Sequence, residues 1–246
     1  MISNDHETMD ELRGYGLSII QPRDGYRFSL DPLLLCDFAS IGEGRAIDLG
    51  AGSGIIPLLL ARKSECVKVV GVELQEEMAA LAERNVRMNG LSDRIEIICA
   101  DILSLRGRYP VSSFDLVIAN PPYRKPESGR ISPKAGRDMA RHETTATLKD
   151  FLETAKYLVK PAGTIAFCYL PLRLAEFSAT AAKLKLALLR MRMVHGNTQA
   201  AARMVLIELA KGSRAGLEVL PPLFVFGANG EYSEEVKRIT SHSLKR

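Results

Sequence analysis

The 246-residue chain lacks the features that mark membrane, secreted and metal-binding proteins. No stretch approaches the roughly 18 apolar residues that a membrane span needs. The first residues are polar and acidic, so we expect no secretory signal. The four cysteines lie at least 30 residues apart without a C-x-x-C pair, and the four histidines are equally scattered. We therefore expect reduced thiols, a cytoplasmic location, no membrane contact and no bound metal.

The chain carries instead an alternation of short apolar runs and helical patterns. The runs typical of buried strands are 46–49, 67–72, 95–98, 114–119 and 164–169. Helical spacing is found over 55–63, 76–89, 148–160 and 171–184. This alternation predicts an α/β fold with a mostly parallel, doubly covered sheet. Two final runs, 186–194 and 204–210, are joined by too few residues for a crossover helix, so they should pair antiparallel.

A glycine loop follows the first of these strands, in the order Asp48-Leu-Gly50-Ala-Gly52-Ser-Gly54. A dinucleotide site requires G-x-G-x-x-G, so that a pyrophosphate can lie on the helix amino terminus. Here the spacing is G-x-G-x-G and the strand carries an acidic residue. An aspartate would repel a pyrophosphate but would attract the ammonium group of an amino acid. The loop therefore argues against an NAD-dependent dehydrogenase.

Polar residues also follow the later strands. Glu73 ends the second strand, Asp101 follows the third and Asn120 follows the fourth. The carboxyl ends of parallel strands meet at one edge of a sheet, where open α/β sheets hold ligands. Glu73 and Asp101 have a second interpretation, because acidic residues are also common as helix N-caps and in first turns.

The fourth strand leads into Asn120-Pro121-Pro122-Tyr123. Two prolines fix φ near −65° and remove two backbone donors, which leaves rigid carbonyl acceptors. Asn120 adds a side-chain acceptor and Tyr123 adds an aromatic face. Acceptors beside a stacking surface suit a planar substrate with an amino group. A proline-rich turn with an ordinary packed tyrosine is the alternative.

The tetrapeptide resembles the NPPY motif of S-adenosylmethionine-dependent amino methyltransferases, whose fold is a Rossmann-like seven-stranded sheet with a reversed edge strand. The resemblance implies that S-adenosylmethionine is the cofactor and that the catalytic segment is Asn120, Pro121, Pro122 and Tyr123. The implied cofactor-binding residues are Asp48, Gly50, Gly52, Gly54, Glu73, Asp101 and Asn120. In such enzymes the asparagine and first proline carbonyls accept the substrate N–H groups, and the tyrosine stacks on the base.

The motif alone leaves adenine N6, guanine N2 of ribosomal RNA and protein glutamine open as substrates. Three further stretches, 25–35, 132–143 and 220–236, together with these motifs resemble the bacterial tRNA-valine adenine-N6 methyltransferases. That resemblance implies methylation of an adenine beside the anticodon. A non-catalytic RNA-binding module with a retained cofactor fold is the alternative from another class.

Basic residues follow the catalytic motif. Segment 124–142 holds six of them, and a second cluster comprises Lys183, Lys185, Arg190 and Arg192. Such clusters attract phosphate backbones, although most charge runs are merely solvated surface. We expect a tRNA partner, bound by Tyr123, Arg124, Lys125, Arg137 and Arg141.

Residues 1–44 fit the alternating pattern poorly. We expect an amino-terminal extension that covers the active-site edge, followed by the methyltransferase domain over residues 45–246. Within the extension, Phe28, Ser29 and Asp31 have two interpretations. They form a lid over the cofactor, or they form the entry of a helix.

Overall fold

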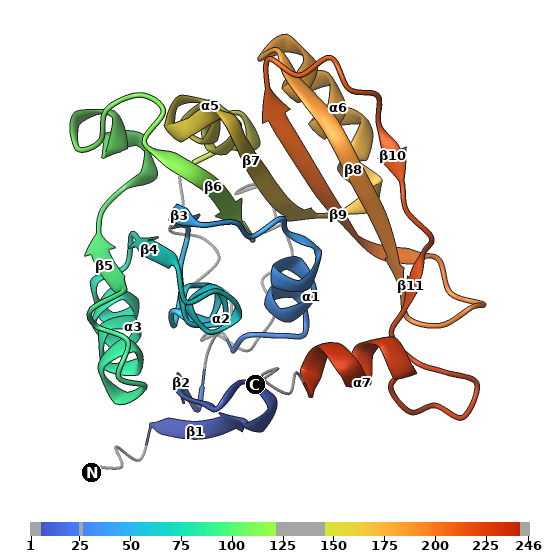
Figure 1. Ribbon diagram of the computed structural model, residues 1–246. Helices are drawn as coiled ribbons and strands as arrows, with labels where there is room; N and C mark the ends of the chain where they lie inside the picture. The colour runs from blue at the N-terminus through green and yellow to red at the C-terminus, as the bar shows by residue number, and fades with distance from the viewer. Residues whose placement is uncertain (1–5, 25–26, 122–145, 242–246) are drawn as a thin grey trace.

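The fold is built around one mixed sheet, and a computed structural model describes residues 6–24, 27–121 and 146–241 (Figure 1). The long strands are β3 (Gly44–Leu49), β4 (Val67–Glu73), β5 (Ile95–Cys99), β6 (Phe114–Ala119), β7 (Val159–Tyr169), β8 (Leu186–His195) and β9 (Ala202–Lys211). Two short strands, β10 (Glu218–Val219) and β11 (Leu223–Phe224), pair in parallel with the outer side of β8. The prediction of an α/β fold with a mostly parallel sheet is confirmed.

The sheet order is β10-β8-β9-β7-β6-β3-β4-β5. Strands β3 to β7 are mutually parallel, and β9 is antiparallel to both β7 and β8. The antiparallel pairing predicted for the last two long strands is therefore correct. The reversed strand is β9, and it does not lie at the edge of the sheet as predicted, because β8 pairs with its outer side.

Helices cover both faces of the sheet (Figure 1). One layer consists of α1 (Asp31–Phe38), α2 (Ile55–Lys63), α3 (Glu76–Met88) and α7 (Glu234–Thr240). The other consists of α5 (Leu148–Leu158), α6 (Leu174–Lys183) and the 3-10 turn η2 (Ile102–Gly107). Two further 3-10 turns are η1 (Arg13–Tyr15) and η3 (Pro171–Arg173).

Two hydrophobic cores lie between these layers and the sheet. Successive strand residues alternate between them, as Ala46 and Ile47 of β3 and Leu116 and Val117 of β6 show. This alternation follows from the period of two in a strand, and burial on both faces explains the continuous apolar runs. Helix α2 is buried over 55–61, because the sheet, α1 and the amino-terminal residues enclose it.

The amino-terminal residues form a hairpin of β1 (Glu7–Leu12) and β2 (Leu17–Pro22), followed by α1. Buried side chains from Tyr15 to Ala39 belong to the same core cluster as α2. The Tyr15 hydroxyl donates to the Ile239 carbonyl of α7 at 2.7 Å. These residues therefore contribute to the main core. A cover formed by residues 1–44 over the active-site edge stays a prediction.

Candidate active site

The candidate site lies where the direction of strand order reverses. From β3 the chain proceeds to β4 and β5 on one side, and then returns to β6 on the other side of β3. Asp48 is level with Ile118 of β6 and with Gly71 of β4. Asn120, the glycine loop and Glu73 therefore lie at one carboxyl edge, on the adjacent strands β6, β3 and β4. Such a switch point is the usual ligand crevice of an open α/β sheet.

The glycine loop is folded in a conformation that favours glycine. Gly50, Gly52 and Gly54 have φ of 95°, 53° and 84°. A Cβ on Gly54 would lie 3.2 Å from the Ala82 Cβ of α3, whereas a Cβ on Gly50 or Gly52 would meet nothing within 4 Å. Gly54 therefore allows close packing against α3. The first two glycines leave space in which a ligand can approach the backbone.

Asp48 has an unusual environment for an acidic residue. Its side chain is fully buried on β3, and neither carboxylate oxygen has a hydrogen-bond partner among the described residues. Burial, and to a smaller degree the charge of Glu73, raises the pKa of Asp48 well above its ordinary value. Buried polar groups are nearly always paired. This orphaned carboxyl group is therefore suited to receive a donor from a bound ligand.

Glu73 braces the glycine loop. Its Oε2 accepts from the Gly52 N–H at 2.8 Å, and its Oε1 accepts from the Gln75 N–H at 3.0 Å. The side chain is half-buried at the end of β4. Each carboxylate oxygen can accept a second hydrogen bond. Glu73 can thus hold the loop and still bind a hydroxyl donor.

Asp101 acts as an N-cap. It precedes η2, and its Oδ1 accepts from the Leu103 N–H at 2.9 Å. The capping interpretation left open by the sequence therefore applies to this residue. An N-cap carboxylate retains acceptor capacity, so a cofactor role for Asp101 is compatible with this contact. That role stays a prediction.

Asn120 and Pro121 directly follow β6, and Pro121 is buried. Pro122, Tyr123, Arg124, Lys125, Arg137 and Arg141 lie outside the described residues. Among the described residues no group of histidine, cysteine, aspartate and glutamate side chains could hold a metal ion. No described helix is long and apolar enough to cross a membrane.

Sequence reasoning misses Asn85, which positions the glycine loop. This fully buried side chain of α3 donates to the Ser53 carbonyl of the loop and to the Ile20 carbonyl of β2, each at 2.9 Å. Its Oδ1 accepts from the Ile20 N–H at 2.7 Å. The signal available in the sequence is a pair of asparagines, Asn85 and Asn89, one turn apart at the end of an otherwise amphipathic helix.

The two arginines of the second basic cluster are paired with carboxylates. Arg190 pairs with buried Glu208 at 2.7 Å, and Arg192 pairs with Glu235 of α7 at 2.7 Å. Their carboxylate partners, Glu208 and Glu235, lie far from them in the sequence, so the residues next to the arginines do not reveal the pairing. Both arginines tie β8 to its neighbours. An RNA surface based on them is therefore not supported.

Phe28, Ser29 and Asp31 adjoin the start of α1. Phe28 packs against the core of the α1 and α2 layer, and its N–H donates to Gln21 Oε1 at 2.8 Å. Ser29 Oγ accepts from the Asp31 N–H at 3.3 Å, within the entry to the helix. These contacts agree with the helix-entry interpretation.

A separate cavity of 380 Å³ lies at the opposite edge of the sheet. Its lining includes Arg45, Val67 and Asp115, which lie at or near the starts of β3, β4 and β6. It is therefore remote from the carboxyl ends of the strands. The candidate active site does not include it.

The fold and the switch-point site define the class as a Rossmann-like methyltransferase. A family model described as the methyltransferase small domain matches residues 31–168. A predicted O-methyltransferase of Agrobacterium tumefaciens has a similar fold, with a TM-score of 0.71 and 24% identity over 87% of this chain and 97% of that protein. TYW2 of Pyrococcus horikoshii, solved in complex with MeSAdo, has a TM-score of 0.58 and 15% identity over 85% of this chain and 72% of its own.

Relatives that are similar in sequence place the chain in a narrower family. A tRNA1(Val) (adenine(37)-N6)-methyltransferase of Porphyromonas gingivalis is 33% identical over 79% of this chain and 77% of the relative. A protein of the same name from Erwinia tasmaniensis is 32% identical over 90% of this chain and 89% of the relative. The chain therefore belongs to the methyltransferase small domain family and, within it, to the family of these relatives. The predicted family is confirmed.

Proposed function

We propose that this enzyme transfers a methyl group from S-adenosylmethionine to the exocyclic N6 amine of an adenine in tRNA. The names of its relatives support this substrate, and support adenine 37 of a valine tRNA as the particular one. A tRNA substrate is also consistent with a cytoplasmic location. The observation that carries the cofactor assignment is the orphaned, buried carboxyl group of Asp48 beside the open Gly50 and Gly52.

The described residues fit S-adenosylmethionine in their chemistry. Asp48 lies at the base of the glycine loop, where a carboxylate complements the ammonium of a methionine moiety. Glu73 and Asp101, at the ends of the next two strands, have acceptor capacity for ribose hydroxyls and an adenine amine. When bound, this cofactor supplies a sulfonium methyl group that is readily attacked by nitrogen.

The chain's own contribution to the reaction is positioning. The Asn120 side-chain carbonyl and the Pro121 carbonyl would accept the two N–H bonds of the adenine amine. These hydrogen bonds orient the nitrogen and increase its electron density, because the amine lone pair is otherwise delocalised into the ring. The adenine nitrogen held in this way would take the methyl group with loss of the methyl–sulfur bond, and the surplus amine proton would leave to solvent.

Tyr123 would stack on the adenine, which must leave its own stack to reach the site. Arg124, Lys125, Arg137 and Arg141 would contact the tRNA backbone. These five roles rest on the sequence motif and its basic neighbours. No metal is required by this chemistry.

Nucleoside mass spectrometry tests the reaction. Total tRNA is incubated with the protein and methyl-labelled S-adenosylmethionine, and we expect N6-methyladenosine to rise in one tRNA. Label in ribosomal guanine or in protein glutamine would show that the substrate is not tRNA adenine. Label in no fraction would favour a non-catalytic binding module. Asn120→Ala should lose turnover while cofactor affinity stays near wild type.

Calorimetry tests the cofactor site separately. Glu73→Gln should weaken S-adenosylmethionine binding by about tenfold, because a charge-assisted hydrogen bond becomes a neutral one. Glu77→Gln is the matched control, since Glu77 is exposed in the first turn of α3. Equal affinities for wild type and both variants would remove Glu73 from the cofactor site.

A further inference from the structure

We propose that an aromatic platform at the carboxyl end of β8 and β11 stacks on an unpaired base of the substrate tRNA, several nucleotides away from the target adenine. The platform consists of His195, Phe224, Phe226 and Tyr232. This inference rests on the proposed tRNA substrate, and it assigns a second, non-catalytic contact to the same RNA.

The platform is made of two ring pairs. The Phe226 and Tyr232 rings are stacked, with centroids 5.4 Å apart and planes at 19°. His195 and Phe224 form a tilted pair with centroids 5.5 Å apart. Burial alternates along the segment, because Leu223 and Val225 are buried while Phe224 and Phe226 are not. Rings of both pairs therefore lie away from the core that holds Leu223.

Two rings of the platform are exposed to solvent, whereas folded proteins usually bury aromatic side chains. Phe226 is 36% exposed and Tyr232 is 43% exposed. Exposed aromatic rings are the elements on which proteins stack the bases of single-stranded nucleic acids. The exposed ring faces are therefore the surface that an unpaired base can contact.

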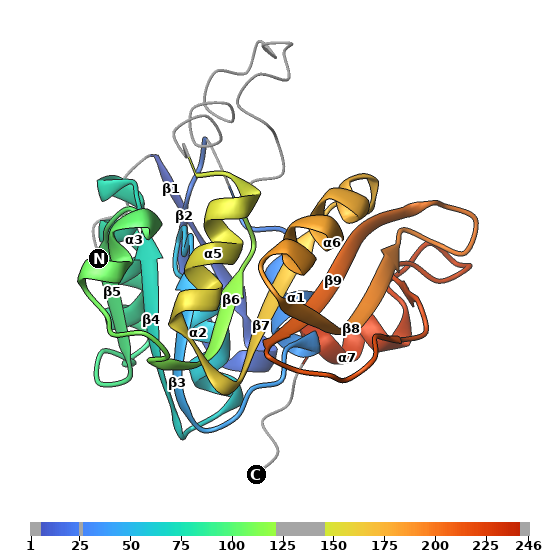
Figure 2. The ribbon, with the colours of Figure 1, turned by 90° about the horizontal axis from the view of Figure 1, so that it is seen from above.

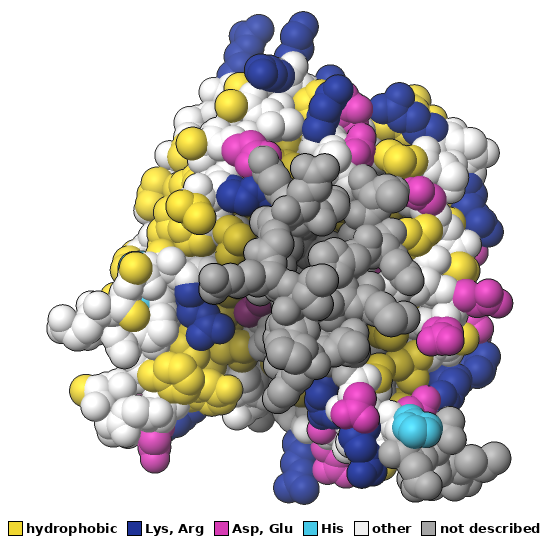
Figure 3. Space-filling model, turned by 180° about the vertical axis from the view of Figure 1, so that it is seen from behind, with side chains coloured by type: hydrophobic (Ala, Val, Ile, Leu, Met, Phe, Trp, Pro, Cys, Tyr) yellow, Lys and Arg dark blue, Asp and Glu magenta, His cyan; other side chains and the backbone are white. Residues whose placement is uncertain are grey.

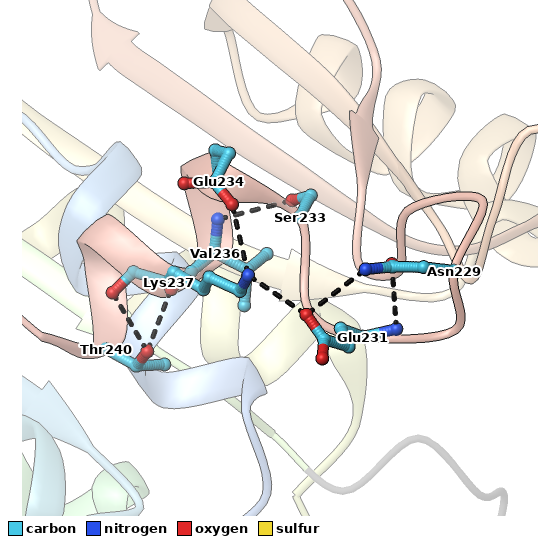
Figure 4. Close-up of polar contacts among 7 residues, drawn as sticks. All are labelled: Asn229, Glu231, Ser233, Glu234, Val236, Lys237 and Thr240. Carbon is cyan, nitrogen blue, oxygen red and sulfur yellow. Dashed lines mark hydrogen bonds and ion pairs between the residues drawn. The ribbon is translucent and has the colours of Figure 1, made fainter.

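The platform is held in place before any ligand binds. Lys237 of α7 lies between Glu231 and Glu234, with its Nζ 3.2 Å and 3.0 Å from their carboxylate oxygens (Figure 4). Asn229 closes the turn through two hydrogen bonds of 3.1 Å with Glu231. Phe226 and Tyr232 are also joined by a backbone bridge. A preorganised surface loses little conformational entropy on binding.

The platform lies at the same edge of the sheet as Asn120. Strand β8 is antiparallel to β9 and β9 to β7, so the end of β8 at His195 is on the side where β6 ends (Figure 2). Four strand steps separate β6 from β11, which is about 19 Å at about 4.8 Å a step. On the face seen in Figure 3, hydrophobic side chains lie beside Lys and Arg side chains.

A cation lies between the platform and the catalytic segment. Arg203 is the second residue of the intervening strand β9, next to Ala202, which pairs with His195. Its side chain is exposed, and it forms no ion pair within the described part of the chain. Arg203 can therefore contact a phosphate of RNA that runs from Asn120 toward the platform. Aromatic faces together with a basic residue are the elements with which proteins bind single-stranded nucleic acid.

The test uses full-length protein and an RNA hairpin with 2-aminopurine placed in turn at each unpaired position on either side of the target adenine. Tyr232→Leu keeps an apolar side chain but removes the aromatic face, and Tyr232→Phe keeps the ring. Stacking is worth about 1–3 kcal/mol per base, so Tyr232→Leu should weaken RNA binding by about 5- to 150-fold and abolish the fluorescence quenching at one position. Tyr232→Phe should behave as wild type. Val111→Ala, at an exposed site outside the platform, is the control.

The outcomes separate this inference from the proposed function. Quenching in wild type and Tyr232→Phe but not in Tyr232→Leu supports the platform. If Tyr232→Leu binds and methylates tRNA as wild type does, the platform is refuted while the proposed function stands. If wild type neither binds nor methylates tRNA, both fail. Should Tyr232→Leu unfold, Phe226→Leu provides the same comparison from the other ring.

Discussion

Replacing Asn85 with alanine should destabilise the fold and weaken cofactor binding together. Its side chain makes three hydrogen bonds, two to Ile20 of β2 and one to the Ser53 carbonyl of the glycine loop. Each contributes about 1 kcal/mol net, so Asn85→Ala should cost about 3 kcal/mol. A chain of this size loses roughly 2–4 °C in Tm per kcal/mol, which gives about 6–12 °C.

Asn89→Ala is the matched control for this prediction. Asn89 also makes three hydrogen bonds, to both backbone groups of Ser18 and to the Asn85 carbonyl, but it is only half-buried and does not contact the glycine loop. Water can replace its contacts, so we expect a cost of about 1 kcal/mol.

Thermal melts and calorimetry with S-adenosylmethionine provide the assay for both variants. Only Asn85→Ala should reduce cofactor affinity, since only Asn85 holds the Ser53 carbonyl. Equal Tm losses in the two variants would refute the argument that burial makes the hydrogen bonds of Asn85 more stabilising than those of Asn89. An unchanged cofactor affinity in Asn85→Ala would refute the link to the loop.

Three further predictions concern the site and its support. Asp48→Asn should flatten the pH dependence of Tm measured without cofactor. Because the pKa of Asp48 is raised in the folded protein, its contribution to stability is fully present below its ordinary pKa of 3.8 and is lost as pH rises. Asparagine does not titrate, so this loss should be missing in the variant. Gly54→Ala should cost more stability in urea unfolding than Gly90→Ala, because both have positive φ but only the added methyl at Gly54 would press against α3; equal costs would contradict this. Arg190→Met should cost about 3 kcal/mol by leaving the Glu208 charge buried, and adding Glu208→Leu should restore part of that loss, as a double-mutant cycle would show.

The sequence predicts the sheet and the edge that holds the site, because both depend on local patterns. Asp48, Glu73 and Asn120 end or follow apolar strands, and parallel strands bring such residues together wherever each strand lies in the sheet. The position of reversed β9 inside the edge depends on pairing between strands, which local patterns do not encode. The helix predicted over 148–160 ends at Leu158, and Pro161 lies within β7 instead.

Contacts between distant residues account for most of the remaining differences. Arg190 and Arg192 appeared as unpaired charge because Glu208 and Glu235 lie 18 and 43 residues away. The roles of Glu73 as loop brace and Asp101 as N-cap depend on backbone groups whose positions require the folded loop. Asn85 was hidden for the same reason, since its partners come from two other segments.

The strand order also constrains how the chain can fold during synthesis. Strand β8 leaves the ribosome before β9, yet β9 lies between β8 and β7 in the finished sheet. From His195, the end of β8, to Lys211, the end of β9, translation takes about 1–3 s at roughly 5–20 residues per second. During that interval Met191 and Val194, buried in the folded protein, have no sheet to join. A nascent chain stalled there would present an unpaired apolar strand to chaperones or to other nascent chains.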